Sequence, residues 1–223
     1  MCQCYLDAPA RAAEGTHTVS VDEMTGIQAL ERIVPTQPMK PGQPERREFE
    51  YKRQGTQCLI GNFEVTTGQV IAPTVQDTRT EEDFANHIAR TVATDPAGGW
   101  IFVADNLTTH CSETLVCWIA KQCGLSEDPG KKGKRGILKS VETRKAFLTD
   151  PSHRIRFVYV PKHTSWMNQI EIWFSILVRR VIKRGNFKST TDLREKILAF
   201  IDYFNRTLAK PFKWTFTGRP LNV

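Results

Sequence analysis

The chain has 223 residues, enough for one large domain, and 40% of them are hydrophobic, which is ordinary for a globular protein. Its 31 Lys and Arg outnumber its 24 Asp and Glu, and the resulting net charge of +7 suits a polyanionic partner such as nucleic acid. No apolar run is long enough to span a bilayer, and the first residues lack the pattern of a secretory signal, so we expect a cytoplasmic protein without a membrane partner.

The six cysteines should stay reduced in that compartment. Cys111, Cys117 and Cys123 lie too far apart to resemble the close CxxC pairs of zinc sites. Cys2 and Cys4 form a lone CxC pair at a terminus that we expect to be loose. We therefore interpret all six as structural or incidental thiols.

The first predicted strand covers residues 17–22, where apolar and polar side chains alternate, and it ends at Asp22 before Gly26 breaks the pattern. Residues 33–46 are rich in Pro, Gly and charge and predict an exposed loop. In 47–73, turn signals at Gln54-Gly55 and at Thr67-Gly68 predict three further short antiparallel strands.

Two helices and a buried strand follow. The segment 80–96 predicts a helix capped by Thr80, with apolar residues four apart on one face. Residues 100–106, WIFVADN, form a nearly continuous apolar run that is typical of a strand covered on both faces. Ser112 begins a second helix that Gly124 ends.

The remaining chain predicts a strand at 155–161 and helices at about 168–184 and 191–206. Residues 126–154 are polar, carry the basic run KKGKRG and contain no long apolar run. The whole order predicts an α/β fold with a mixed central sheet, in which antiparallel strands come first and strand–helix units then add parallel strands. Such sheets bind ligands at the carboxyl ends of their strands.

Three acidic residues stand where such a site would form. Asp22 and Asp105 end predicted strands, and Glu171 lies where a loop becomes a helix. Carboxylates in these positions are costly to bury unless they bind a cation, and three together suit a hard divalent metal. Taken singly, each also fits a structural role, as a turn residue, in a capping loop or in the first turn of a helix.

Four segments carry a family resemblance. THTVSVDEMTG, VADNLTTH and HTSWMNQIEIWFSIL, in that order, resemble the catalytic domain of DDE transposases, and among these the bacterial insertion-sequence transposases related to mariner elements. PFKWTFTG, after YFNRTLAK, is similar to their C-terminal end. The resemblance covers about residues 17–220 and leaves 1–16 as an N-terminal remnant or linker.

The resemblance implies an RNase H-like fold and a metal-binding catalytic triad of Asp22, Asp105 and Glu171. Asp22 would bridge two Mg²⁺ or Mn²⁺ ions, Asp105 would bind one and Glu171 the other. Glu23 is the nearest rival for the first position. Asn106 and Asn168, beside the acids, would orient waters or ligating oxygens.

In that family the triad cuts the ends of a transposon and joins them to target DNA, so the implied partners are double-stranded DNA and further copies of the chain. The implied location is the bacterial nucleoid. Candidate DNA contacts are His110, His163, Lys131, Lys132, Lys134, Arg135, Lys183 and Arg184.

The chain departs from the family in two respects. The interval from Asp105 to Glu171 is longer than in mariner relatives, so 126–154 looks like an insertion. The helix-turn-helix modules that would precede residue 17 are not seen. An alternative hypothesis is therefore a truncated, inactive remnant that binds DNA or a full-length transposase, and a weaker one is an RNA–DNA hybrid nuclease.

Overall fold

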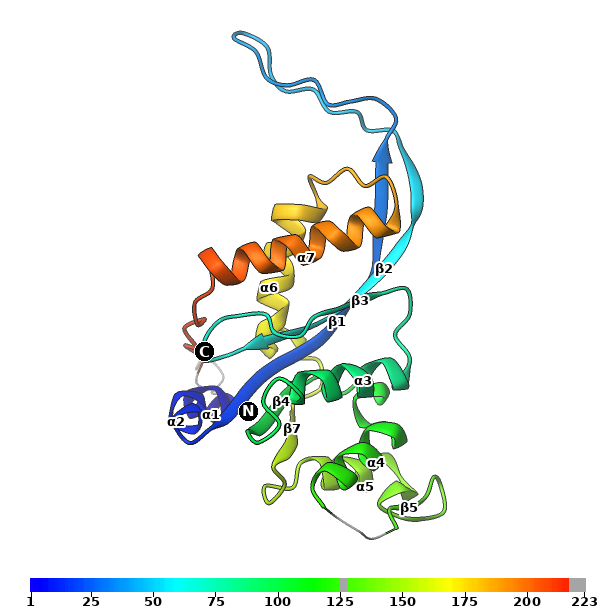
Figure 1. Cartoon of the computed structure of the whole chain (residues 1–223), viewed down its shortest axis with the longest axis vertical. Coiled ribbons are helices and arrows are strands. Elements are labelled where there is room, and N and C mark those ends of the chain that lie inside the picture. Colours follow the sequence, from blue (N-terminus) through cyan, green and yellow to red (C-terminus); the bar gives the residue numbers. More distant parts are fainter. Residues whose placement is uncertain (125–127, 217–223) are drawn as a thin grey trace, which may run out of the picture.

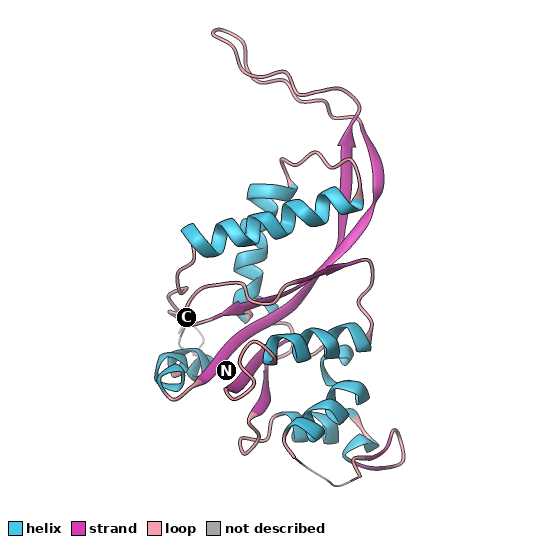
Figure 2. Cartoon of the chain, in the orientation of Figure 1, coloured by secondary structure: helices cyan, strands magenta, loops and turns pink. Residues whose placement is uncertain are grey.

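A five-stranded mixed sheet forms the centre of the computed structural model, which describes residues 1–124 and 128–216 (Figures 1 and 2). The strands lie in the order β3-β2-β1-β4-β7. The first three pair antiparallel, and β4 and β7 add to β1 in parallel, as the sequence predicts. The strand bounds are β1 Thr16–Arg32, β2 Tyr51–Glu64, β3 Thr74–Gln76, β4 Gly99–Ala104 and β7 Ile155–Tyr159.

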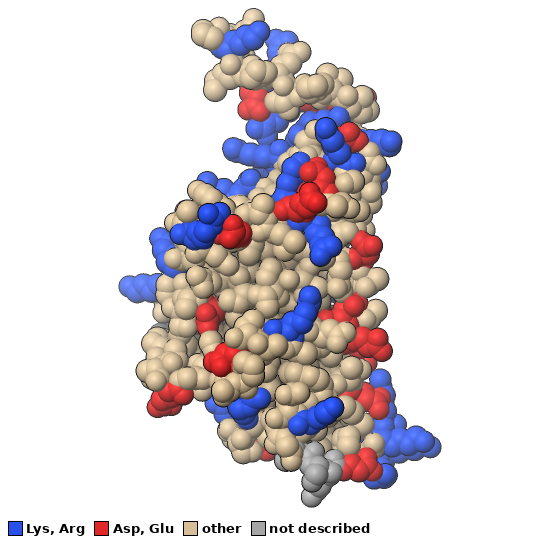
Figure 3. Space-filling view, in the orientation of Figure 1, with Lys and Arg blue, Asp and Glu red and all other residues tan. Residues whose placement is uncertain are grey.

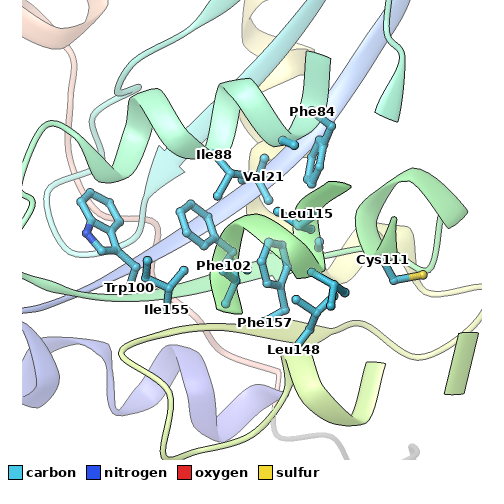
Figure 4. Packing of buried hydrophobic residues seen from close by; sticks show 14 of the residues in the cluster. Val21, Phe84, Ile88, Trp100, Phe102, Cys111, Leu115, Leu148, Ile155 and Phe157 are labelled. Carbon is cyan, nitrogen blue, oxygen red and sulfur yellow. The ribbon is translucent and has the colours of Figure 1, made fainter. Parts of the chain in front are cut away.

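Helices cover both faces of this sheet. On one face, α3 (Glu81–Val92), α4 (Glu113–Gln122) and α5 (Val141–Leu148) pack on the strands around Phe102 and Phe157, as Figure 4 shows. On the other face, α6 (Gln169–Leu177) and α7 (Thr190–Thr207) enclose a second core around Trp173. The predicted cap of α3 is confirmed, because the Thr80 hydroxyl accepts a hydrogen bond from the Asp83 N–H.

The strands β1 and β2 are longer than the sequence predicts, and fewer strands precede α3. β1 does not end at Gly26, because this glycine takes a φ of +65° at a shift in register between Met24 and Ile27. β2 likewise runs through Gly55, which has a φ of +116°. Glycine at positive φ allows a β-bulge that bends a strand without ending its pairing. Three strands therefore precede α3, not four.

The long β1–β2 hairpin projects from the body as an arm, with residues 33–50 at its tip (Figure 1). The predicted loop at 33–46 is confirmed, and two isolated backbone bridges, between Gln37 and Arg46 and between Lys40 and Gln43, tie its sides together.

The N-terminal residues are not loose. They form α1 (Cys2–Leu6) and α2 (Ala8–Ala13), which pack beside the end of β4. Tyr5 and Ala8 are buried against Val103 and Met167. The terminus thus forms a third, smaller hydrophobic cluster together with residues of the sheet. All six cysteines are free thiols, as predicted.

The polar region 126–154 contains structure that the sequence did not predict; its residues 126 and 127 lie outside the described chain, as do 217–220 of the expected domain. Leu138 and Leu148 are buried in the main core, and Arg144 donates to the Cys111 carbonyl oxygen over 2.7 Å. The region holds the short strands β5 (Gly130–Lys131) and β6 (Arg135–Gly136), a 3-10 turn at Ile137–Lys139 and α5.

The helix predicted at 168–184 is α6 followed by a π-helical turn at Val178–Ile182. Two other 3-10 turns, Thr108–Cys111 and Ser165–Met167, precede α4 and α6. No helix in the described ranges is both long and apolar enough to cross a membrane.

Gly68 offers a test of close packing, because a Cβ there would lie 2.1 Å from the Lys210 carbonyl carbon. We expect Gly68→Ala to lower the free energy of unfolding in urea by about 1 kcal/mol for its positive φ and by about 1–3 kcal/mol more for the clash. Gly124→Ala is the matched control, since its φ of +67° is similar and an added Cβ would meet no atom within 4 Å among the described residues, its chain neighbours aside. Equal losses in the two variants would contradict this packing.

Candidate active site

Two of the predicted acids meet because β1 and β4 are parallel neighbours. Ser20 pairs with Val103, so the same register carried two residues further places Asp22 level with Asp105. Both follow the apolar parts of their strands, at the carboxyl edge of the sheet. The negative charge of Asp105 raises the pKa of Asp22, which is consistent with their closeness.

The third acid comes to this edge on α6. Asn168, the residue before the helix, donates from Nδ2 to Asp22 Oδ2 over 3.1 Å and to the Val21 carbonyl oxygen over 2.9 Å. Glu171 lies in the first turn that follows. Burial raises the pKa of Glu171, and the charge of Asp105 raises it further. The structure thus gathers the three predicted acids and Asn168 at one edge.

Asp22 is a buried carboxylate, 7% exposed. Burial raises its pKa to about 7, although the Glu23 N–H donates to its Oδ1 over 2.8 Å and stabilises the charged form. No Lys or Arg forms an ion pair with Asp22 in the part of the chain that the structure describes. The charge of His110 lowers the pKa of Asp22 but does not offset burial, so a bound cation would further stabilise the charged form.

His110 links Glu23 to Asp105. Its Nε2 lies 2.8 Å from Glu23 Oε2, and its Nδ1 lies 2.8 Å from Asp105 Oδ1. Burial lowers the pKa of His110, but the two carboxylates outweigh burial and raise it to about 10. Burial likewise raises the pKa of Asp105, but the hydrogen bonds from His110 and the Leu107 N–H, together with the positive charges of His110 and Lys145, outweigh burial and lower the pKa overall. The imidazolium thus holds the Asp105 carboxylate charged and in one orientation.

The same contact separates Asp22 from its rival Glu23. Successive side chains of a strand point to opposite faces. Asp22 shares a face with Ser20 and contacts Asn168, whereas the Glu23 side chain is 2% exposed and is bound to His110. Ligand atoms of Asp22, Glu23 and His110 do lie within 4.8 Å of one another. This group shares only Asp22 with the predicted triad, and both nitrogens of His110 already bind carboxylates.

The donor set at this edge fits a hard divalent cation. Carboxylate oxygens suit Mg²⁺ and Mn²⁺. Burial and the charge of Asp105 both disfavour the charged form of Asp22, and such an ion would offset both effects.

Asn106 holds the ends of β4 and β7 together. Its Nδ2 donates to the Val160 carbonyl oxygen, and its Oδ1 accepts from Lys145 Nζ over 2.6 Å. Lys145 lies on α5, 5.0 Å from the centre of the Tyr159 ring, and its charge lowers the pKa of Asp105. The sequence did not point to Lys145, because α5 was not predicted.

The candidate DNA contacts are dispersed. His110 is fully buried with both ring nitrogens bonded, so its predicted contact with DNA does not fit the structure. His163, with a φ of +63°, lines a hollow next to Asp105. Four of the candidate residues lie on the small β5–β6 hairpin (Figure 1), namely Lys131, Lys132, Lys134 and Arg135. The other two, Lys183 and Arg184, follow α6.

The raised pKa of Asp22 predicts a specific dependence of stability on pH. The folded pKa of about 7 exceeds the ordinary Asp value of 3.8, so the folded state binds more protons between these values and loses stability as pH rises. In EDTA, we expect Asp22→Asn to increase the free energy of unfolding by roughly 2–4 kcal/mol at pH 8, with the gain vanishing below pH 4.

Urea unfolding at a series of pH values measures this gain. The control is Asp202→Asn, since Asp202 is an exposed partner of Arg206 on α7. If the difference in the free energy of unfolding between Asp22→Asn and wild type does not change with pH, the pKa of Asp22 is not raised in the folded state.

Comparison with known proteins places this chain in a family. The profile of the family described as DDE superfamily endonuclease matches residues 17–194. No curated protein matches the chain significantly in sequence. Among solved structures, the Mos1 transposase paired-end complex with left transposon end is similar over 90% of this chain and 52% of that one, with 12% identity and a TM-score of 0.51.

Two other solved structures are less similar. The Mos1 strand transfer complex has 10% identity and a TM-score of 0.46, over 90% of this chain and 52% of that one. The simian T-cell lymphotropic virus intasome in complex with the PP2A regulatory subunit B56 gamma has 10% identity and a TM-score of 0.42, over 94% and 62%. The chain thus spans about half the length of the Mos1 chains.

The likeness to the Mos1 paired-end complex confirms the predicted RNase H-like fold, with its mixed sheet flanked by helices. The predicted resemblance to mariner-related DDE enzymes is also confirmed, whereas the bacterial origin remains a prediction. Because the family profile covers most of its length, the chain belongs to the DDE superfamily of endonucleases.

Proposed function

We propose that this chain is the catalytic domain of a transposase, which cleaves DNA strands and transfers them to a target. The observation that carries the proposal is the position of Asp22, Asp105 and Glu171 at one edge of the sheet of a DDE superfamily endonuclease. These three carboxylates would hold the metal ions. Two bound Mg²⁺ or Mn²⁺ ions would activate the attacking oxygen and stabilise the leaving one.

The chain's own residues prepare these carboxylates. Asn168 donates to Asp22 Oδ2 and leaves Oδ1 in contact with the Glu23 N–H. His110 donates to Asp105 and balances its charge together with that of Glu23. Such surrounding hydrogen bonds fix the orientation of metal ligands, and their loss typically costs 10–100-fold in affinity or activity.

Positive charge beside α6 supports DNA as the substrate. Three arginines and one lysine line a groove between α6 and the end of α7, and among the described residues none of them forms an ion pair. On the face in Figure 3, basic side chains also gather over the arm and the upper body. The groove cations are Arg179, Arg180, Arg184 and Lys210.

Nicking of supercoiled DNA tests the proposal. With Mn²⁺ or Mg²⁺, we expect wild-type protein to nick the plasmid and Asp105→Asn to lose at least about 100-fold in rate, because a metal ligand is removed. Asp202→Asn, on the exposed side of α7, should keep the wild-type rate.

Three outcomes separate the alternatives. Wild-type protein that neither binds Mn²⁺ nor cuts any DNA would overturn the proposal. Salt-sensitive DNA binding without cleavage would instead favour a remnant that only binds DNA. Faster cleavage of RNA–DNA hybrids than of duplex DNA would favour a hybrid nuclease.

The arm supports a further part of the proposal, namely that copies of the chain associate. Near its tip, Phe49 is 83% exposed, Met39 75% and Ile33 63%. Several large apolar side chains exposed on one projecting segment are typical of a surface that another protein covers. We propose that a second copy of this chain packs against the arm.

Light scattering after size exclusion tests this association. We expect wild-type protein to form dimers or larger assemblies, and Met39→Glu with Phe49→Glu to dissociate at least about tenfold more readily, because charges would be buried at the contact. Tyr203→Glu, an exposed position on α7, is the control. A wild-type monomer at all concentrations, or an unchanged assembly in the double variant, would contradict it.

A further inference from the structure

The start of α6 is capped in an unusual way. The first N–H groups of a helix have no partner within the helix, and the side chain of the preceding residue commonly accepts one of them. Asn168 is that preceding residue, yet its side chain makes no capping bond. It contacts Asp22 and the Val21 carbonyl oxygen instead. The helix must therefore find its capping groups elsewhere.

Two hydroxyl groups from other elements take over this role. The Gln169 N–H donates to the Tyr5 hydroxyl of α1 over 3.3 Å. The Ile170 N–H donates to the Ser20 hydroxyl of β1 over 2.9 Å. The Glu171 N–H bonds the Asn168 carbonyl oxygen over 3.1 Å. Each N–H at the start of the helix thus has a partner, although Asn168 supplies none from its side chain.

The Tyr5 hydroxyl binds the backbone of the residues before and after Asn168. Its hydroxyl donates to the Met167 carbonyl oxygen over 3.0 Å and accepts from Gln169. Tyr5 is 3% exposed, Asn168 is fully buried, and the Tyr5 ring lies 4.7 Å from that of Trp214. The polar atoms of this junction are therefore shielded from water, and water is not available to replace a lost hydroxyl.

We propose that Tyr5 is a positioning residue of the active site. By binding the Met167 carbonyl oxygen and the Gln169 N–H, its hydroxyl fixes the backbone on both sides of Asn168, which orients Asp22, and the first turn that carries Glu171. The inference rests on the proposed function, because it assigns the purpose of this junction to the metal-binding carboxylates. It also makes α1 a part of the active site, where the sequence predicts only a linker.

The hydroxyl and the ring of Tyr5 have different roles in this proposal. The ring packs in the core with Val103 and Met167, and a merely structural residue would need only the ring. Tyr5→Phe keeps the ring and removes the hydroxyl. In its absence, the Met167 carbonyl oxygen and the Gln169 N–H lose a buried partner, and the backbone that holds Asn168 against Asp22 is less firmly fixed.

The test compares Tyr5→Phe with two controls. Tyr203→Phe removes an exposed hydroxyl on α7, and Gly68→Ala lowers stability through a clash outside this junction. For Tyr5→Phe, we expect about tenfold faster hydrogen exchange of the amides of residues 168–171 in the metal-free protein, and about fivefold weaker Mn²⁺ binding by calorimetry. Both controls should keep wild-type values of both quantities.

The outcomes separate this inference from the proposed function. If wild-type protein binds Mn²⁺ and nicks DNA while Tyr5→Phe keeps the wild-type affinity and exchange, the positioning role is overturned and the proposed function stands. Faster exchange with unchanged Mn²⁺ affinity also overturns it, because the cap would then be structural only. Wild-type protein without Mn²⁺ binding overturns the proposed function and, with it, the role of the cap in metal binding.

Discussion

The parallel pairing of β1 with β4 creates an electrostatic constraint to which the surrounding structure is adapted. It brings Asp22 and Asp105 to one edge of the sheet, where burial and mutual repulsion both disfavour their charges. Two neighbouring carboxylates, of which Asp22 is buried and Asp105 half-buried, would share protons or separate if nothing held them. The structure keeps them together by giving each a different set of partners, and these partners come from several distant segments.

Asp105 and Asp22 have different electrostatic surroundings. Asp105 receives positive charge, from His110 through a hydrogen bond and from Lys145 through space, so it stays ionised. Asp22 accepts hydrogen bonds only from neutral donors, Asn168 and the N–H of Glu23, and burial raises its pKa to about 7 even though the charge of His110 lowers it. A cation bound between the two carboxylates would therefore change the charge state of Asp22 more than that of Asp105.

Much of this arrangement was predictable because it depends on local patterns. The apolar run before Asp105, the alternation before Asp22 and the Thr80 cap each lie within a few residues, and the structure has all three. The continuation of β1 past Gly26 was not predictable in the same way, because a glycine that ends a strand and one that forms a bulge look alike until the partner strand is known.

Contacts between segments that are distant in the sequence could not be predicted from it either. Glu23 and His110 are 87 residues apart, and nothing in the sequence near either residue indicates that their side chains form a hydrogen bond. The helix α5 was missed because its surface is largely polar, and its capping box of Ser140 and Thr143 lies within a region otherwise typical of a loop. Prediction was therefore good for the positions of the acids and poor for the groups that tune them.

Two segments that appear peripheral in the sequence contact the residues that hold the acids in place. Tyr5 of α1 bonds the residues on either side of Asn168, and Lys145 of α5 bonds Asn106 next to Asp105. Both lie outside the strands that carry the acids. This division has a physical reason, since a strand end can present a carboxylate but cannot surround it. The groups that hold and balance its charge must come from elements packed against the edge.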